Sequence, residues 1–175
     1  GAYTMNFKDK SLDGYGSLCV DPYFVENYHD NDYRKDLFQD WGYTAQGGKV
    51  VRLLNSKFAF QDIDNGITDM DLMRTSEMYL IKAECQLALG DGNAAMATIN
   101  QLRQARAIEG TDNTLSGNAT IDTILEERAV EFCGEQMRWF DLKRTGKLYE
   151  YVEKYNAQAS ANLKADGSKH YLYRP

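Results

Sequence analysis

Residues 69–88 carry apolar side chains at helical spacing on two sides, and this pattern constrains the fold more than any other feature of the sequence. The first stripe consists of Leu72, Ser76, Tyr79, Leu80, Ala83 and Leu87. The second stripe consists of Met78, Ile81, Cys85 and Ala88. Positions three or four apart share one face of a helix, and a helix that is apolar on two faces packs between neighbours. The sequence therefore predicts a helix that has a partner on each side.

A second helix is predicted after a short turn. Gly90 can adopt the left-handed conformation that ends a helix, and Asp91 or Asn93 can cap the start of the next one. The apolar residues that share one face of the range 94–107 are Ala95, Ile99 and Leu102. The two helices are expected to form a helical hairpin with small residues at the crossing.

Helical patterns continue downstream, so the predicted fold class is all-α. Thr120 or a neighbour opens a helix whose apolar positions are Ile121, Ile124, Leu125, Ala129, Phe132 and Cys133. Gly134 breaks this pattern, which then resumes with Met137, Phe140 and Leu142. A last amphipathic stretch contains Leu148, Tyr151, Val152 and Tyr155.

The chain divides by composition into three parts. Residues 1–68 are rich in turn-forming residues and are predicted to form long loops, with a short helix at Tyr33–Trp41. Within them, Val50–Leu54 and Lys57–Phe60 form a candidate β-hairpin joined at Asn55-Ser56. The helical core is expected over 69–155, followed by a polar tail over 156–175.

Charged residues lie close to the apolar faces of the predicted helices, where they are tolerated only if paired and hydrogen-bonded. We therefore expect an interhelical ion network made of Arg74, Glu77, Glu84, Glu127, Arg128, Glu131, Glu135, Arg138, Asp141 and Arg144. The pairs three residues apart, within reach on one helix, are Arg74–Glu77, Glu135–Arg138, Arg138–Asp141 and Asp141–Arg144.

A catalytic interpretation would make Glu127 and Glu131 an acid and base pair on one helix face. Such a pair needs one carboxyl group with a raised pKa. The arginines near every carboxylate would lower these pKa values instead. We therefore predict no catalytic residues and expect a protein that is not an enzyme.

Charge and composition argue against several other kinds of partner. The 26 acidic and 20 basic residues give a net charge of −6, which disfavours binding to nucleic acid and to anionic lipid. The two histidines, His29 and His170, are isolated in polar sequence, so we expect no metal site and no cofactor. No apolar run is long enough to span a bilayer.

Two blocks of sequence resemble the SusD/RagB family of outer-membrane nutrient-binding lipoproteins. The first block matches at Arg74, Glu77, Tyr79, Leu80, Ile81, Ala83 and Glu84, and its second helix matches at Asn100 and Arg103. The other block matches at Glu127, Arg128, Glu131, Phe132, Glu135, Arg138, Asp141, Leu142 and Arg144. Asn31-Asp32-Tyr33-Arg34 resembles a weaker upstream element, whereas Ala105 and Gln136 depart from the pattern.

The resemblance implies tetratricopeptide-like helical hairpins in the C-terminal part of a protein about three times longer, cut before the family's C-terminal segment. It also implies a surface-exposed lipoprotein of the outer membrane of a Bacteroidetes-type bacterium, held by a lipid anchor missing from this chain. Family members bind glycans, or sometimes peptides, and pass them to a SusC-like TonB-dependent transporter. The expected partners are therefore an oligosaccharide or polysaccharide and such a transporter.

The ligand-contacting residues are not carried by the family motifs. Trp41 and Tyr43 lie in a Gly-rich stretch predicted to be a loop, and an aromatic face can stack on a sugar ring. We therefore take Trp41 and Tyr43 as candidate ligand-binding residues, with packing of a loop anchor as the alternative role. At the level of the whole protein, the alternative is a tetratricopeptide-like adaptor that binds another protein without a small ligand.

Overall fold

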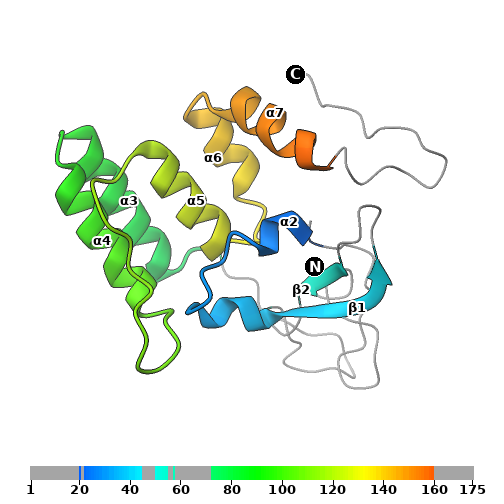
Figure 1. Ribbon diagram of the computed structural model, residues 1–175. Coiled ribbons are helices and arrows are strands. Elements are labelled where there is room, and N and C mark those ends of the chain that lie inside the picture. The colour runs from blue at the N-terminus through cyan, green and yellow to red at the C-terminus, as the bar shows by residue number, and fades with distance from the viewer. Residues whose placement is uncertain (1–19, 21, 45–49, 55–56, 58–71, 160–175) are drawn as a thin grey trace. The chain divides into compact units, whose positions relative to one another are not determined.

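The structure, a computed structural model, describes residues 20, 22–44, 50–54, 57 and 72–159 (Figure 1). Its elements are α2 (Pro22–Val25), the 3-10 helix η1 (Tyr33–Leu37), β1 (Phe38–Thr44), β2 (Val50–Leu54), α3 (Thr75–Ala88), α4 (Gly92–Gln104), α5 (Ile121–Glu131), α6 (Arg138–Arg144) and α7 (Leu148–Ala159). The chain forms two compact units. We call Tyr28–Lys35 with Met70–Arg138 the helical unit, and the rest of the chain the second unit.

The predicted helical hairpin is formed by α3 and α4, which lie side by side in the helical unit (Figure 1). Gly90 has a φ of 87°, the left-handed conformation that ends α3. Asp91 caps α4, because its Oδ1 accepts a hydrogen bond of 2.8 Å from the backbone N–H of Ala94. The predicted turn chemistry is therefore confirmed at both positions.

The helix α5 packs against α3 and completes the core of the helical unit. Thr120 caps α5 in a reciprocal arrangement with Thr123, whose hydroxyl accepts from the backbone N–H of Thr120. The buried core consists of Leu80, Ala83, Ala95, Met96, Ile99, Leu102, Ala119, Ile124 and Phe132. The predicted inward face of α4 is thus confirmed.

After α5 the chain turns at Gly134, which has a φ of 82°, and continues into α6 and α7. Leu142 of α6 and Tyr151 of α7 are buried, as their helical spacing predicts. Phe140 is 66% exposed, although it belongs to the same predicted pattern. The helical fold class is confirmed, and the division of the chain at residues 68 and 155 stays a prediction.

One strand of the predicted β-hairpin lies within the described residues and pairs with a strand that the sequence did not predict. β2 is present with its predicted bounds, but it pairs antiparallel with β1, with Phe38 opposite Leu54. The predicted pairing of β2 with Lys57–Phe60 stays a prediction, because residues 58–60 lie outside the described residues. The sequence does not predict β1 as a strand, because Asp40 and Gly42 are of residue types that are depleted in strands.

The short helix predicted at Tyr33–Trp41 is correct only in its first half. The 3-10 helix η1 ends at Leu37, and Phe38–Trp41 belong to β1. Trp41 and Tyr43 therefore lie in a strand and not in the loop that their glycine-rich surroundings suggested. Aromatic residues favour strands, and here this preference outweighs the single glycine between them.

Candidate functional site

Residues 31–34 contribute two charged side chains, Asp32 and Arg34, to a buried cluster in the helical unit, and backbone hydrogen bonds hold these residues in place. The backbone N–H of Tyr33 donates to the carbonyl of Arg106 at 3.1 Å, and that of Ile108 donates to the carbonyl of Asn31 at 2.8 Å. Asp32 and Ala107 face each other across this pairing. The segment is thereby held next to the C-terminal end of α4.

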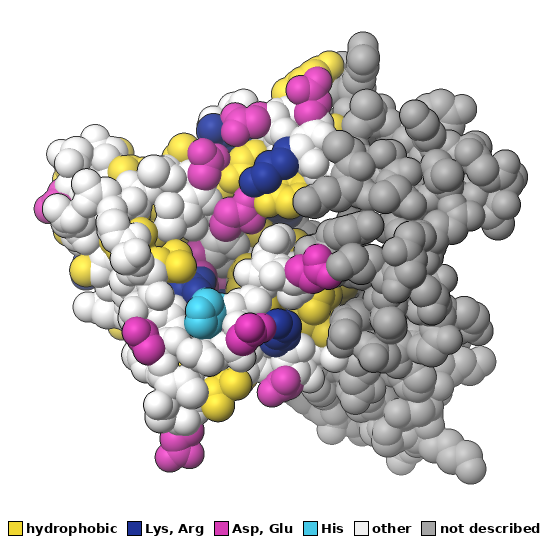
Figure 2. Space-filling model, in the orientation of Figure 1, with side chains coloured by type: hydrophobic (Ala, Val, Ile, Leu, Met, Phe, Trp, Pro, Cys, Tyr) yellow, Lys and Arg dark blue, Asp and Glu magenta, His cyan; other side chains and the backbone are white. Residues whose placement is uncertain are grey.

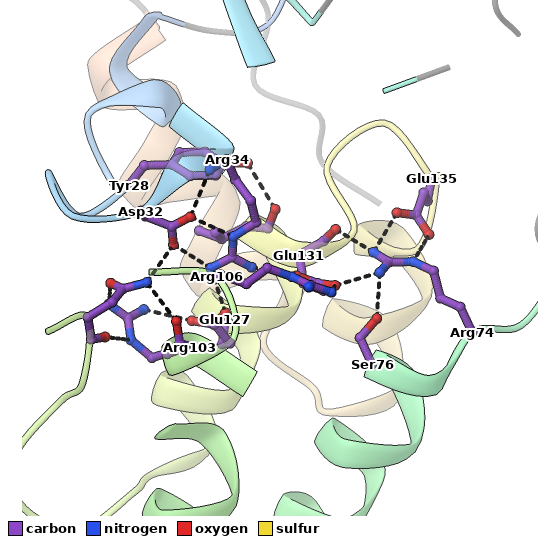
Figure 3. Close-up of polar contacts among 12 residues, drawn as sticks. Tyr28, Asp32, Arg34, Arg74, Ser76, Arg103, Arg106, Glu127, Glu131 and Glu135 are labelled. Carbon is purple, nitrogen blue, oxygen red and sulfur yellow. Dashed lines mark hydrogen bonds and ion pairs between the residues drawn. The ribbon is translucent and has the colours of Figure 1, made fainter. Parts of the chain in front are cut away.

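Arg34 forms the centre of the cluster (Figure 3). Its Nη1 donates to Glu131 Oε2 at 2.5 Å, and its Nη2 donates to Glu127 Oε1 at 3.0 Å. Its Nε and Nη2 bind the two carboxylate oxygens of Asp32 at 2.8 and 2.5 Å. One planar guanidinium therefore binds three carboxylates, which the point charge of a lysine could not reproduce.

Arg103 of α4 reaches the other oxygen of Glu127, with an Nη1 to Oε2 distance of 2.7 Å. The same guanidinium donates to the carbonyl and the side-chain oxygen of Asn113 at 2.7 and 2.9 Å. Asn113 in turn donates from Nδ2 to Asp32 Oδ2 at 3.0 Å. These contacts close a loop of hydrogen bonds from Arg34 through Glu127 and Arg103 back to Asp32.

Glu131 joins this group to the start of α3. Its Oε1 lies 2.5 Å from Arg74 Nη1 and 2.9 Å from Arg106 Nη2. Arg74 also binds both oxygens of Glu135, at 2.8 and 3.1 Å, and donates to the hydroxyl of Ser76. Four arginines and four carboxylates thus form one charge-balanced set, which we call the ion cluster: Asp32, Arg34, Arg74, Arg103, Arg106, Glu127, Glu131 and Glu135.

The central carboxylates of the ion cluster are buried, and neighbouring arginines lower the pKa of two of them, Glu131 and Asp32. The side chains of Asp32, Glu127 and Glu131 are each 1% exposed. Burial opposes ionisation of Glu131, but Arg106, Arg34 and Arg74 outweigh it and hold the pKa of Glu131 well below its usual range. Burial likewise opposes the charge of Asp32, whose pKa is nevertheless lowered by Arg34 and Asn113.

An acid held in this way cannot serve as a general acid near neutral pH, because it never carries the proton that it would have to donate. The geometry of the ion cluster therefore fits a structural brace for the helices and not a reaction centre. One of its members also lies over an aromatic ring: the guanidinium of Arg74 is 4.8 Å from the centre of Phe132, and Arg128, which is outside the ion cluster, lies 5.0 Å from the same ring.

The residues of the predicted ion network fall into several groups in the structure. Those that the structure brings into the ion cluster are Arg74, Glu127, Glu131 and Glu135. Glu77 faces Arg128 at 3.7 Å, not Arg74 as the spacing on one helix predicted. Asp141 and Arg144 form the predicted pair three residues apart, at 3.1 Å.

The two remaining members of the predicted network are Arg138 and Glu84. Arg138 donates to the backbone carbonyl of Leu125 at 2.6 Å and lies 3.9 Å from the carboxylate of Glu126. Glu84 is a half-buried residue of α3.

Sequence reasoning missed several members of the ion cluster, namely Asp32, Arg34, Arg103, Arg106 and the connecting Asn113. A signal for three of them was present, because Asp32, Arg34 and Arg103 lie in segments that resemble family motifs. The i,i+3 rule could not assign their partners, since Arg34 and Glu131 are separated by 97 positions in the chain.

The candidate ligand residues Trp41 and Tyr43 lie in β1, and their side chains fall outside the described residues. Among the residues that the structure describes, no three His, Cys, Asp or Glu side chains gather in a way that would hold a metal ion. No helix in the described ranges is both long enough and apolar enough to cross a bilayer. On the face drawn in Figure 2, basic and acidic side chains of the described residues are interspersed.

The hairpin of α3 and α4, together with α5 and the charge-balanced ion cluster that braces them, defines a helical scaffold. Comparison with known proteins gives the family: the profile of the SusD family matches residues 36–175. This range is most of the chain, so the chain belongs to the SusD family, whose members are binding proteins and not enzymes. The family resemblance of the sequence motifs is confirmed.

Two curated relatives and one crystal structure show how much of a family member is present. A SusD-like protein of Formosa agariphila is 31% identical over 151 residues, which cover 78% of this chain and 30% of that protein. A second SusD-like protein of the same organism is 25% identical over 162 residues, or 87% of this chain and 30% of its own length.

The crystal structure is that of a SusD-like carbohydrate binding protein from Bacteroides vulgatus. It superposes with a TM-score of 0.65 and is 34% identical, covering 82% of this chain and 30% of that one. The chain therefore spans about a third of the length of the relatives that it matches.

Proposed function

We propose that this chain is part of a glycan-binding lipoprotein that lies on the outer-membrane surface and passes its ligand to a SusC-like TonB-dependent transporter. The observation that carries the proposal is the match to the SusD family over residues 36–175. The structural similarity to a carbohydrate binding protein of Bacteroides vulgatus, at 34% identity, supports the same ligand class. Attachment to the membrane would be through a lipid anchor.

The ion cluster supports a binding function in which these helices are the frame. Its acids are saturated by arginines, and Glu131 stays ionised, so the charged groups brace the helical unit and do not need to contact a ligand. Neutral sugars are recognised by aromatic faces and hydrogen bonds, which a separate surface would have to supply.

Trp41 and Tyr43 are the candidates for such a surface. The pairing of β1 with β2 is regular from Phe38 to Asp40 and shifts before Thr44, so both aromatic residues lie in the irregular section. Irregular pairing of this kind re-aims side chains and is common beside binding sites. This position favours a role for Trp41 and Tyr43 in ligand contact.

The test uses the full-length protein, of which this chain is one part, and isothermal titration with a panel of plant, algal and host polysaccharides. We expect saturable binding of at least one glycan, and Trp41→Ala should weaken it by about tenfold, or about 1.4 kcal/mol. Trp139→Phe, at the half-exposed tryptophan of α6, is the matched control and should leave the affinity unchanged.

Unchanged affinity in Trp41→Ala would reject Trp41 as a sugar platform while leaving glycan binding in place. Absence of binding to every glycan in the panel would reject the proposed ligand class. The partner is tested separately, by co-purification of the full-length protein with a SusC-like transporter from the same organism.

A further inference from the structure

The chain passes between the helical unit and the second unit at four points, which we call the crossings. It enters the helical unit at Tyr28, leaves it after Lys35, returns at Met70 and leaves again after Arg138. The strands β1 and β2 lie between the second and third crossings. The freedom of these strands therefore depends on how firmly the helical unit holds the chain where it leaves and returns.

The ion cluster contributes a side chain close to three of the crossings. Arg34 lies beside the second crossing, Arg74 shortly after the third and Glu135 shortly before the fourth. Glu131 connects two of them, because its Oε2 accepts from Arg34 and its Oε1 from Arg74, each at 2.5 Å (Figure 3). Arg74 in turn binds both oxygens of Glu135. One path of hydrogen bonds thus joins three places where the chain enters or leaves the helical unit.

The first crossing is held by a contact next to the same path. The hydroxyl of the buried Tyr28 donates to the backbone carbonyl of Val130 at 2.9 Å. Val130 immediately precedes Glu131 in the last turn of α5. This turn therefore contacts the chain at the first three crossings and leads, through Glu135, to the fourth.

The helices of the helical unit do not need the buried charges to hold them together. The apolar core already joins α3, α4 and α5 through Leu80, Ile99 and Ile124. A buried ion pair is in general no more stabilising than apolar side chains in its place, but its geometry is more specific. The position of these charges at the crossings indicates that they fix the course of the chain there.

We propose that the ion cluster anchors the crossings and limits the movement of β1 and β2, which makes Arg34 a positioning residue for Trp41 and Tyr43. Arg34 belongs to η1, which continues without a gap into β1 at Phe38. Three carboxylates fix the plane of its guanidinium, so η1 cannot turn without breaking several of these contacts. The part of this inference that concerns Trp41 and Tyr43 rests on the proposed glycan-binding function.

The experiment compares two variants of the full-length protein that lose stability for different reasons. Arg34→Lys keeps the positive charge but cannot bind three carboxylates at once. Ile99→Ala, the matched control, leaves a cavity in the apolar core and changes no residue of the ion cluster. Both variants should melt at a lower temperature than the unmodified protein. Amide hydrogen exchange in Phe38–Leu54 should become at least about fivefold faster in Arg34→Lys and stay unchanged in Ile99→Ala.

The affinity for the glycan separates positioning from stability. At a temperature where both variants are folded, Arg34→Lys should weaken binding by at least about threefold, as when only about a third of the molecules hold the binding conformation. Ile99→Ala should leave the affinity unchanged. If Arg34→Lys does not fold, Arg74→Gln takes its place, because Arg74 is only half-buried, and it should show the same pattern to a smaller extent.

Unchanged exchange of β1 and β2 in both arginine variants would overturn the proposal. Equal acceleration in Ile99→Ala would also overturn it, because the effect would then be a general loss of stability. Faster exchange with unchanged affinity would reject Arg34 as a positioning residue. If the unmodified protein binds no glycan, the proposed function fails, whereas the exchange measurement still decides whether the ion cluster anchors the crossings.

Discussion

Glu131 is a single buried side chain that pairs with three arginines from different parts of the chain. Its two oxygens receive Arg34, Arg74 and Arg106 at 2.5, 2.5 and 2.9 Å, and the side chain is 1% exposed. A buried charge is costly unless its partners compensate it, and removal of one partner leaves the others uncompensated. Glu131 pairs with three arginines from three separate segments, so its removal should weaken the attachment of all three segments.

Glu131→Gln is therefore expected to lower the free energy of unfolding by about 3–5 kcal/mol. The neutral amide keeps the shape of the side chain but leaves three arginines with less negative charge around them. Urea denaturation followed by circular dichroism measures the change. Glu109→Gln is the matched control, because Glu109 is exposed in the same unit, and it should change stability by less than about 0.5 kcal/mol. A similarly small effect of Glu131→Gln would show that the contacts contribute little.

At the scale of elements, local chemistry predicts much of the fold. Gly90, Asp91 and Thr120 end or start helices through contacts within a few residues, so their roles can be inferred without knowledge of the tertiary fold. The pairing of β1 with β2 follows no such local rule. The ladder partner of Leu54 is Phe38, sixteen positions away, and Asp40 and Gly42 weaken the strand pattern between them.

The cap of α5 gives a prediction at this scale. Thr120→Ala removes the hydroxyl that accepts from the backbone N–H of Thr123 at 3.2 Å, and with it the contact between the two threonine hydroxyls at 3.1 Å. The hydrogen bond from the backbone N–H of Thr120 to the Thr123 hydroxyl remains. We expect a loss of about 1 kcal/mol in the free energy of unfolding. Ser116→Ala, in the exposed loop before the helix, is the control and should be neutral. A neutral Thr120→Ala would mean that the turn is held by its other contacts alone.

At the scale of the whole molecule, the ion cluster joins parts of the chain that are far apart in sequence. Arg34 and Glu131 are 97 positions apart, and Arg74 and Glu131 are 57 apart. The sequence indicates that charges near apolar faces must be paired, and four of its predicted members do join the cluster. It cannot indicate which segments meet, because the periodicity that reveals a helix carries no information about its neighbours. For that reason the sequence did not predict Asp32 and Arg34, which lie outside the predicted helical core, as members of the cluster.

The same long-range cluster should make the folded protein sensitive to acid. Arg106 and the other arginines hold the pKa of Glu131 below its usual range against the effect of burial, and the pKa of Asp32 is lowered in the same sense. In the unfolded chain the pKa values of Glu131 and Asp32 are about 4.3 and about 3.9. A carboxyl whose pKa is lower in the folded state stabilises the fold fully above the unfolded pKa, and this contribution is lost as the pH falls towards the folded pKa.

We therefore expect the free energy of unfolding to be nearly constant from about pH 7 to 5 and to fall steadily below about pH 4. Urea denaturation at a series of pH values measures this dependence, and the slope at acid pH should be shallower in Glu131→Gln, which has lost one of the responsible groups. Equal slopes in the two proteins would show that other carboxyls set the acid sensitivity.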